Sequence, residues 1–266
     1  MSWFQAVIMG LVQGIAEFLP ISSTAHLALL PWVFNWKNPE LHALSFDVAL
    51  HVGTLVAIVA YFWRDWVRLI ARGFTHPLQG DGRLFWFLVI ALIPGALAGF
   101  LLQTQAETIF RAPWLIGLML IVMGVILGFS DRMGSKRIDL EHISFWRAIA
   151  VGVGQAFAII PGVSRSGSTM TAGLLVGMTR EAAARFSFLL SAPIILGAAL
   201  VEVPHAAASG SLLTTHTLLA IVVAAISGFA AIAFLLDYLK RHGFGVFVWY
   251  RIVVGLFVIG LFLVRG

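Results

Sequence analysis

Six long apolar segments, each nearly free of charge, constrain this 266-residue chain more than any other feature of its sequence. They lie near residues 46–63, 84–103, 114–130, 186–203, 216–237 and 245–264. A helix needs about 20 apolar residues to cross the hydrocarbon core of a bilayer, so each segment predicts a transmembrane helix. Hydrophobic residues make up 60% of the chain and charged residues 11%, against about 25% charged in a typical soluble domain. The sequence therefore predicts an all-α polytopic membrane protein, with residues 1–266 in a single membrane domain.

The charge and the cysteine content exclude several other classes of protein. The net charge is +5, but the basic residues fall in short connections between apolar segments, whereas a nucleic-acid-binding protein gathers them on a soluble face. The absence of cysteine excludes disulfides and thiolate metal sites. The first basic residue is Lys37, so the apolar start lacks the basic n-region of a signal peptide. We expect membrane lipids, and no nucleic acid, among the partners.

Two further apolar stretches, near 3–35 and 148–178, are interrupted at their centres by Pro20 and Pro161. Each Pro is followed by Ser-rich sequence. Pro removes a backbone donor and ends a helix. Backbone groups freed in this way cannot face lipid, so the interruptions must line a cavity or pack against protein. We expect both stretches to fold as re-entrant helical hairpins.

The basic residues also predict the orientation in the membrane. The stretches 64–83 and 131–147 hold four Lys or Arg residues each, whereas 204–215 holds none. Because cytoplasmic connections carry an excess of Lys and Arg, this distribution places 64–83 and 131–147 in the cytoplasm and both chain ends outside.

The chain contains a weak internal repeat. Gln13 precedes Ser22 by nine residues, as Gln155 precedes Ser164. The two halves run over about residues 1–133 and 142–266. Each half holds one hairpin and three spans, and because three is odd, the second half must enter the membrane from the opposite side. This predicts an inverted-topology repeat, an architecture that places the functional site where the repeats meet.

The first interruption carries groups suited to chemistry. Gln13 and Glu17 are four residues apart and share a helix face. Ser22 or Ser23 can cap the helix that follows Pro20. Ser23 and His26 are three residues apart, close enough for a hydroxyl and a base to cooperate.

The second interruption suits an anion. Ser164, Ser166 and Thr169 open a helix whose N-terminal N–H groups and dipole favour negative charge. Arg165 adds a forked donor that matches phosphate. An Arg in the middle of a membrane costs about 2.5–3.5 kcal/mol, and an anionic ligand would offset that cost. If the two hairpins meet, Arg165 and the hydroxyls face Glu17 and His26.

The same residues also have structural interpretations, which stay open. Ser and Thr are common packing residues in membrane helices. Glu17 and Arg165 can form an ion pair that holds the repeats together, and His26 can cap a helix.

Two further pairs of ionisable residues lie inside the apolar segments. Asp47 and His51 are one turn apart, and whether they line a cavity is left open. Arg251 and Asp237 are interpreted as a pair, or as side chains that snorkel to the cytoplasmic face.

The Gln13-xxx-Glu17 pair, the run Leu-Pro-Ile-Ser-Ser-Thr-Ala-His ending at His26 and the run Pro-Gly-Val-Ser-Arg-Ser-Gly starting at Pro161 closely resemble the undecaprenyl-diphosphate phosphatase family, known for bacitracin resistance. The resemblance covers essentially the whole chain. It implies hydrolysis of undecaprenyl diphosphate to undecaprenyl phosphate and inorganic phosphate, which recycles the lipid carrier for peptidoglycan synthesis. It also implies a multi-pass protein of the bacterial inner membrane, an active site that opens to the periplasmic side, and a divalent metal, Mg²⁺ or Ca²⁺.

The resemblance also implies roles for individual residues. Glu17 matches the essential acid and possible metal ligand, Ser23 the nucleophile, His26 the general base or acid, and Arg165 the group that binds pyrophosphate. The other matched positions, which flank the nucleophile or line the pocket, are Ser22, Thr24, Ser164, Ser166 and Thr169. Gln13 stands where many members carry a second Glu, so one anionic ligand is absent, although a Gln carbonyl oxygen can also bind a cation.

Other functions remain as alternatives. A transporter or flippase of undecaprenyl phosphate is the main one, because inverted repeats with broken helices are also transporter architecture. A carrier needs an anion site but no nucleophile, so the Ser23–His26 pair favours the enzyme. A purely structural membrane subunit would have no need of Arg165. The oligomeric state, monomer or homodimer, and the choice between a phosphoserine and direct attack by metal-activated water stay open.

Overall fold

A computed structural model describes residues 1–107, 109–208 and 214–265, with the side chains of 103–107, 109 and 202–208 left out. The α-helices in these ranges are α1 (Trp3–Phe18), α2 (Ser23–Val33), α3 (Leu44–Tyr61), α4 (Trp63–Thr75), α5 (Gly80–Glu107), α6 (Pro113–Met133), α7 (Phe145–Ala156), α8 (Arg165–Leu175), α9 (Arg180–Ala208), α10 (Thr215–Leu239) and α11 (Gly245–Arg265). The 3-10 helices in the same ranges are η1 (Pro39–His42), η2 (Ile109–Arg111), η3 (Leu140–His142) and η4 (Phe157–Ile159).

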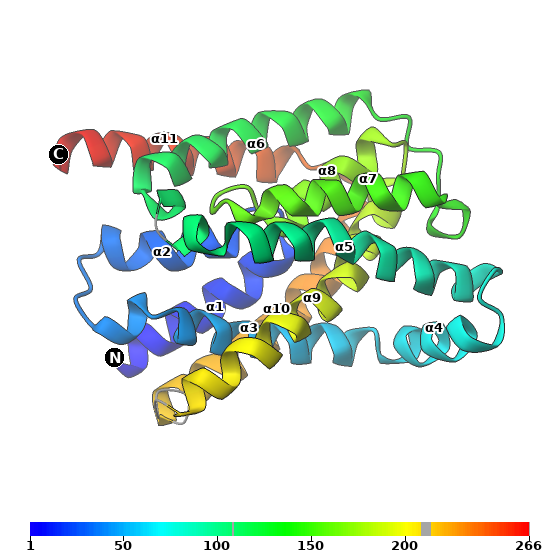
Figure 1. The fold of residues 1–266 in the computed structure, drawn as a ribbon. Helices are drawn as coiled ribbons and strands as arrows, with labels where there is room; N and C mark the ends of the chain where they lie inside the picture. The colour runs from blue at the N-terminus through cyan, green and yellow to red at the C-terminus, as the bar shows by residue number, and fades with distance from the viewer. Residues whose placement is uncertain (108, 209–213, 266) are drawn as a thin grey trace.

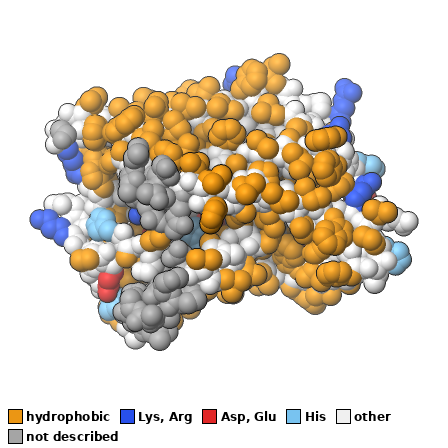
Figure 2. Space-filling model, in the orientation of Figure 1, with side chains coloured by type: hydrophobic (Ala, Val, Ile, Leu, Met, Phe, Trp, Pro, Cys, Tyr) orange, Lys and Arg blue, Asp and Glu red, His pale blue; other side chains and the backbone are white. Residues whose placement is uncertain are grey.

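Six helices among the described residues are long and apolar enough to cross a membrane, namely α3, α5, α6, α9, α10 and α11. They overlap the six predicted segments one for one. Hydrophobic side chains cover the middle of the face shown in Figure 2, and most of the visible Lys and Arg side chains lie toward its two ends. The predicted all-α polytopic membrane fold is therefore confirmed.

Both predicted helix breaks are present. The first lies between α1 and α2, and the second between η4 and α8. Ser22 and Ser164, the residues that precede α2 and α8, have left-handed φ values of 75° and 73°. Each side-chain oxygen accepts a backbone N–H three residues further on, from Ala25 and Gly167. The two breaks are thus local copies of one another, whereas their re-entrant placement in a bilayer stays a prediction.

The short helix that precedes each break packs against a long helix from the other half of the chain. α1 packs along α10, and α7 packs along α5, so each half supplies a long helix to the short helix of the other (Figure 1). Gly14 of α1 lies against the backbone of Gly228 in α10, and the side chain of Gln155 in α7 lies against Gly95 in α5. Small residues let membrane helices approach closely. The division into inverted halves stays a prediction, and this exchange of partners supports it.

The basic connections gather at the end of the molecule opposite the termini. Figure 1 shows both termini at its left end and the α4–α5 connection at its right end. Arg68 forms an ion pair with Asp81 at 2.9 Å, and Arg83 donates to the carbonyl of Glu141 at 3.0 Å. The second contact joins the stretches 64–83 and 131–147, which the charge count places on one side.

The charges of the stretch 64–83 indicate a connection between two spans, but the stretch contains most of α4. Trp63, Val67, Ile70 and Phe74 are all exposed and recur at helical spacing, so they form one apolar face. The Arg residues interleaved with them obscure this periodicity in the sequence.

Candidate active site

The two helix breaks lie against each other and are joined by hydrogen bonds. The hydroxyl of Ser22 accepts the backbone N–H of Gly162 at 3.2 Å. The hydroxyl of Ser166 donates to the carbonyl of Leu19 at 3.0 Å. Each break therefore satisfies a backbone group of the other, so the two breaks meet, which the sequence had left as a condition.

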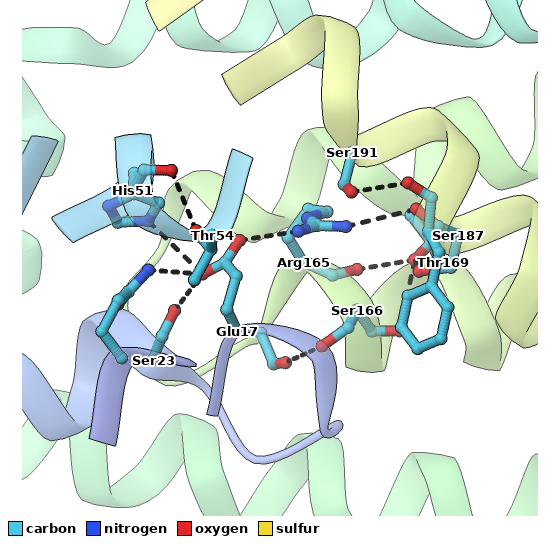
Figure 3. Close-up of polar contacts among 12 residues, drawn as sticks. Glu17, Ser23, His51, Thr54, Arg165, Ser166, Thr169, Ser187 and Ser191 are labelled. Atoms are coloured by element: carbon cyan, nitrogen blue, oxygen red, sulfur yellow. Dashed lines mark hydrogen bonds and ion pairs between the residues drawn. The ribbon is translucent and has the colours of Figure 1, made fainter. Parts of the chain in front are cut away.

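Glu17 is the centre of the polar cluster between the breaks (Figure 3). Its side chain is 6% exposed, and its Oε1 accepts from Arg165 Nη2 at 2.6 Å. Its Oε2 accepts from Ser23 Oγ at 2.6 Å and from Gln13 Nε2 at 3.1 Å. The Nε2 atom of His51 lies 3.4 Å from the same oxygen. Side chains from α1, α2, α3 and α8 thus converge on one buried carboxylate.

Arg165 is fixed from a second side by α9. Its Nη1 donates to the carbonyl of Ser187 at 3.2 Å, and the hydroxyl oxygens of Thr169 and Ser187 lie 2.7 Å apart. Thr169 also donates to the carbonyl of Arg165 at 2.7 Å. The Glu17–Arg165 ion pair, left open by the sequence, therefore exists, and it holds the guanidinium at the junction of the two halves.

A small cavity lies at this cluster. Its volume is about 60 Å³, and it is lined by Ala16, Glu17, Ser23, Thr24, His51, Ala158, Ser164 and Arg165. Such a space has room for a few water molecules, so a diphosphate head group requires it to widen. Thr24 is the exposed residue among the lining, which places it at the mouth.

A larger cleft of about 1010 Å³ shares no lining residue with this cavity. Four of its charged side chains pair with one another: Asp65 with Arg68 at 2.8 Å, Asp65 with Arg185 at 3.3 Å, and Asp81 with Arg68 at 2.9 Å. Of these two cavities, the small one is the better candidate site, because a buried carboxylate, a hydroxyl and a guanidinium meet there.

Nine of the ten predicted site residues divide into two groups, and His26 belongs to neither. Five of them line the cavity, namely Glu17, Ser23, Thr24, Ser164 and Arg165. Four others are buried behind the cavity wall, namely Gln13, Ser22, Ser166 and Thr169. Ser22, Ser166 and Thr169 bind other protein groups and so hold the wall in place. Gln13 donates to Glu17 through Nε2, while its Oε1 has no hydrogen-bond partner among the described residues.

His26 does not pair with Ser23, contrary to the expectation from their spacing. Its Nδ1 lies 2.7 Å from the carbonyl oxygen of Ser22, and since a carbonyl can only accept, Nδ1 carries the proton. Its Nε2 lies 2.7 Å from the hydroxyl of Tyr250 on α11. The hydroxyl of Ser23 turns instead to Glu17. A spacing of three residues predicts proximity on a helix but not the direction of either side chain.

Asp47 and His51, which the sequence left open, differ in placement. His51 lines the cavity, with its Nδ1 held by the carbonyl of Asp47 at 2.7 Å. Asp47 itself pairs with Arg111 at 3.3 Å and is absent from the cavity wall. Ser187 is a residue that the sequence did not indicate, because it lies inside an apolar span.

Arg251 neither pairs with Asp237 nor reaches an aqueous face, which corrects both interpretations made from the sequence. It is fully buried, and its guanidinium donates to backbone carbonyl oxygens at the two helix breaks, including those of Pro20 at 3.0 Å and Gly162 at 2.7 Å. Asp237 binds Lys240 at 3.2 Å. The breaks leave carbonyl groups without helical donors, and these groups attract the guanidinium inward.

Known proteins are similar to this chain over the two helix breaks and the cluster around Glu17. The family model described as bacitracin resistance protein BacA matches residues 6–257. A protein of Moorella thermoacetica named undecaprenyl-diphosphatase is 53% identical over 100% of both chains, and one of that name from Desulforudis audaxviator is 51% identical over 100% of both. A third of that name, from Pelotomaculum thermopropionicum, is 50% identical over 98% of this chain and 97% of its own. Because these matches include both helix breaks and the cluster around Glu17, the chain belongs to the bacitracin resistance protein BacA family.

Proposed function

We propose that this protein hydrolyses undecaprenyl diphosphate to undecaprenyl phosphate and inorganic phosphate, recycling the lipid carrier for peptidoglycan synthesis and conferring bacitracin resistance. One observation carries the proposal: the Ser23 hydroxyl lies 2.6 Å from Glu17 in a cavity whose wall also contains Arg165. A hydroxyl beside a base and a cation is what nucleophilic phosphoryl transfer requires. The names of the relatives support the choice of substrate.

The reaction proceeds in two steps. In the first, Ser23 Oγ forms a bond to the terminal phosphorus, the bond from that phosphorus to the bridging oxygen breaks, and undecaprenyl phosphate leaves. The proton of Ser23 passes to Glu17 Oε2, its hydrogen-bond partner. In the second, water attacks the phosphoserine, phosphate leaves and Ser23 regains its proton. Arg165 neutralises negative charge on the transferred phosphoryl group. The phosphoryl group and Glu17 therefore compete for the guanidinium.

A divalent cation, Mg²⁺ or Ca²⁺, is part of the proposal. Among the described residues no group of three His, Cys, Asp or Glu side chains is placed to hold a metal ion. The carboxylate of Glu17 and the Oε1 of Gln13, a buried oxygen with no hydrogen-bond partner, fit a hard cation. These two residues would hold the ion together with the phosphates of the substrate. When bound, it would supply neutralisation of phosphate charge.

The proposed location is the bacterial inner membrane, with the site opening to the periplasmic side. The gathering of basic connections opposite the termini supports this orientation. The prenyl tail stays in lipid while the head group enters the cavity past Thr24. A homodimer stays a prediction.

Phosphate release from undecaprenyl diphosphate by the purified protein in detergent, with Mg²⁺ or Ca²⁺ present, tests the proposal. We expect release by the wild type and a phosphoserine on Ser23 in rapidly quenched samples. No release would overturn hydrolysis, and movement of undecaprenyl phosphate across proteoliposomes would then identify a transporter. Release with near-normal turnover by Ser23→Ala would replace the phosphoserine with direct attack by water.

A further inference from the structure

Arg251 is the largest fully buried side chain among the described residues, and it lies within the apolar helix α11. None of the ion pairs found in the described part of the chain includes it. An unpaired Arg at membrane depth is costly and therefore points to a functional role.

Among the described residues, the hydrogen-bond acceptors of the Arg251 guanidinium are all backbone carbonyl oxygens. Nη1 donates to Pro20 at 3.0 Å, and Nη2 donates to Gly162 at 2.7 Å and to Val163 at 3.0 Å. Nε donates to Leu120 on α6 at 3.3 Å. Pro20 belongs to the first break, and Gly162 and Val163 belong to the second. The Arg251 side chain thus links both breaks, because it donates hydrogen bonds to carbonyl groups that lie outside the helices and accept no helical N–H.

Those carbonyl groups lie next to the reacting residues along the chain. Pro20 is three residues before Ser23, and Val163 is two residues before Arg165. Gly167 lies in the first turn of α8, and a Cβ atom there would be 2.8 Å from Arg251 Nη1, so the guanidinium lies directly against that turn. Arg251 therefore holds the backbone next to Ser23 and the backbone next to Arg165 at a fixed separation.

The charge of Arg251 has a second consequence. Because no carboxylate of the described side chains pairs with it, its positive charge adds to that of the two helix N-termini at the breaks. Burial weakens the screening that water gives to exposed charges, so an unpaired buried charge acts beyond its own contacts. An anionic head group in the cavity benefits from it even without touching it.

We propose that Arg251 is a positioning residue of the hydrolase, which fixes Ser23 and Arg165 relative to each other through the two breaks and favours binding of the diphosphate by its unpaired charge. This inference rests on the proposed function. It predicts two separable effects. Loss of the planar guanidinium lowers kcat, and loss of the positive charge raises KM.

The test compares Arg251→Lys and Arg251→Gln in phosphate release from undecaprenyl diphosphate. Lys keeps the charge but not the planar fork, so kcat falls while KM changes little. Gln loses both, so KM rises in addition. Misplacement of a reacting group by about 1 Å costs on the order of 10²-fold, and we expect a fall in kcat of about that size in both variants.

Arg265→Gln is the matched control. Arg265 is also on α11 and also donates to backbone carbonyl groups, those of Trp32 at 2.7 Å and Val33 at 2.9 Å, but at the far end of α2. We expect its kcat and KM to match those of the wild type. Equal kcat and KM for Arg251→Lys, Arg251→Gln and the wild type would overturn the inference, as would equal losses in Arg265→Gln and the Arg251 variants.

A distance measurement separates positioning from general loss of stability. The chain has no cysteine, so Ile15→Cys and Phe157→Cys, at side chains 41% and 59% exposed, can carry a pair of spin labels beside the site. We expect one narrow distance in the Arg251 background and a broadened one in Arg251→Lys. An unchanged distance in a folded Arg251→Lys variant would refute positioning. If the wild type released no phosphate, the proposed function would fail, whereas the distance result would still decide the role of Arg251.

Discussion

Replacing Gly14 with Ala is expected to displace α1 from α10 and, with it, Glu17. A Cβ atom at this position would lie 2.5 Å from the carbonyl oxygen of Ala224 and 2.7 Å from the backbone nitrogen of Gly228. Both neighbours are backbone atoms of a packed helix and cannot rotate away. Ordinary contact begins near 3.4 Å, so the first distance falls short by about 0.9 Å and the helices must separate by a similar amount.

This displacement predicts both a stability and an activity effect. Overpacking of a well-packed interior costs about 1–3 kcal/mol, and we expect a lower Tm in detergent. Glu17 lies three residues after Gly14 on the same helix, so its contacts with Ser23 and Arg165, both 2.6 Å, lengthen. A shift of about 1 Å in a reacting group lowers turnover on the order of 10²-fold.

Gly260→Ala is the control for this experiment. Gly260 is on α11, and a Cβ atom added there has no neighbour within 4 Å. Ala is favoured over Gly in a helix by roughly 0.5–1 kcal/mol, so this variant keeps or raises Tm and keeps wild-type phosphate release. Thermal unfolding and phosphate release are measured for both variants. A Gly14→Ala variant with the Tm and turnover of the wild type would refute the argument that α10 fixes the position of Glu17.

Four further outcomes are expected. Ser23→Ala abolishes the trapped phosphoserine and most phosphate release, and a phosphoserine that persists in this variant, detected by mass spectrometry, would exclude Ser23 as the nucleophile. Arg165→Lys keeps the charge but loses the fork that spans Glu17 and Ser187, so kcat/KM falls on the order of 10²–10³-fold, and steady-state kinetics with unchanged kcat/KM would contradict this role. Chelation of divalent cations stops phosphate release and added Mg²⁺ or Ca²⁺ restores it, whereas full activity in excess chelator would remove the metal from the proposal. Tyr250→Phe removes the 2.7 Å contact to His26 and leaves the cluster around Glu17 intact, so turnover changes far less than in Ser23→Ala.

The spans and the breaks could be predicted from the sequence because their causes are local. A run of apolar residues long enough for a bilayer becomes a transmembrane helix wherever it lies, and the six predicted segments all overlap helices. Pro20 and Pro161 lie within the two breaks, where a residue without a backbone N–H leaves no helical hydrogen bond unmade. The cap at Ser22 follows from its hydroxyl and the neighbouring backbone. The periodicity of α4 is equally local, but the charges of that stretch conceal it.

The direction of each side chain in the site was decided by the tertiary structure. His26 binds Tyr250, 224 residues away, and Arg251 binds the carbonyl of Pro20, 231 residues away. Spacing along a helix places a side chain on a face, but its partner depends on which distant element packs there. The sequence therefore determined that two polar breaks interrupt a membrane bundle. Only the packing of α1, α8 and α11 around them decided that Ser23 meets Glu17 and that a single buried Arg joins both breaks.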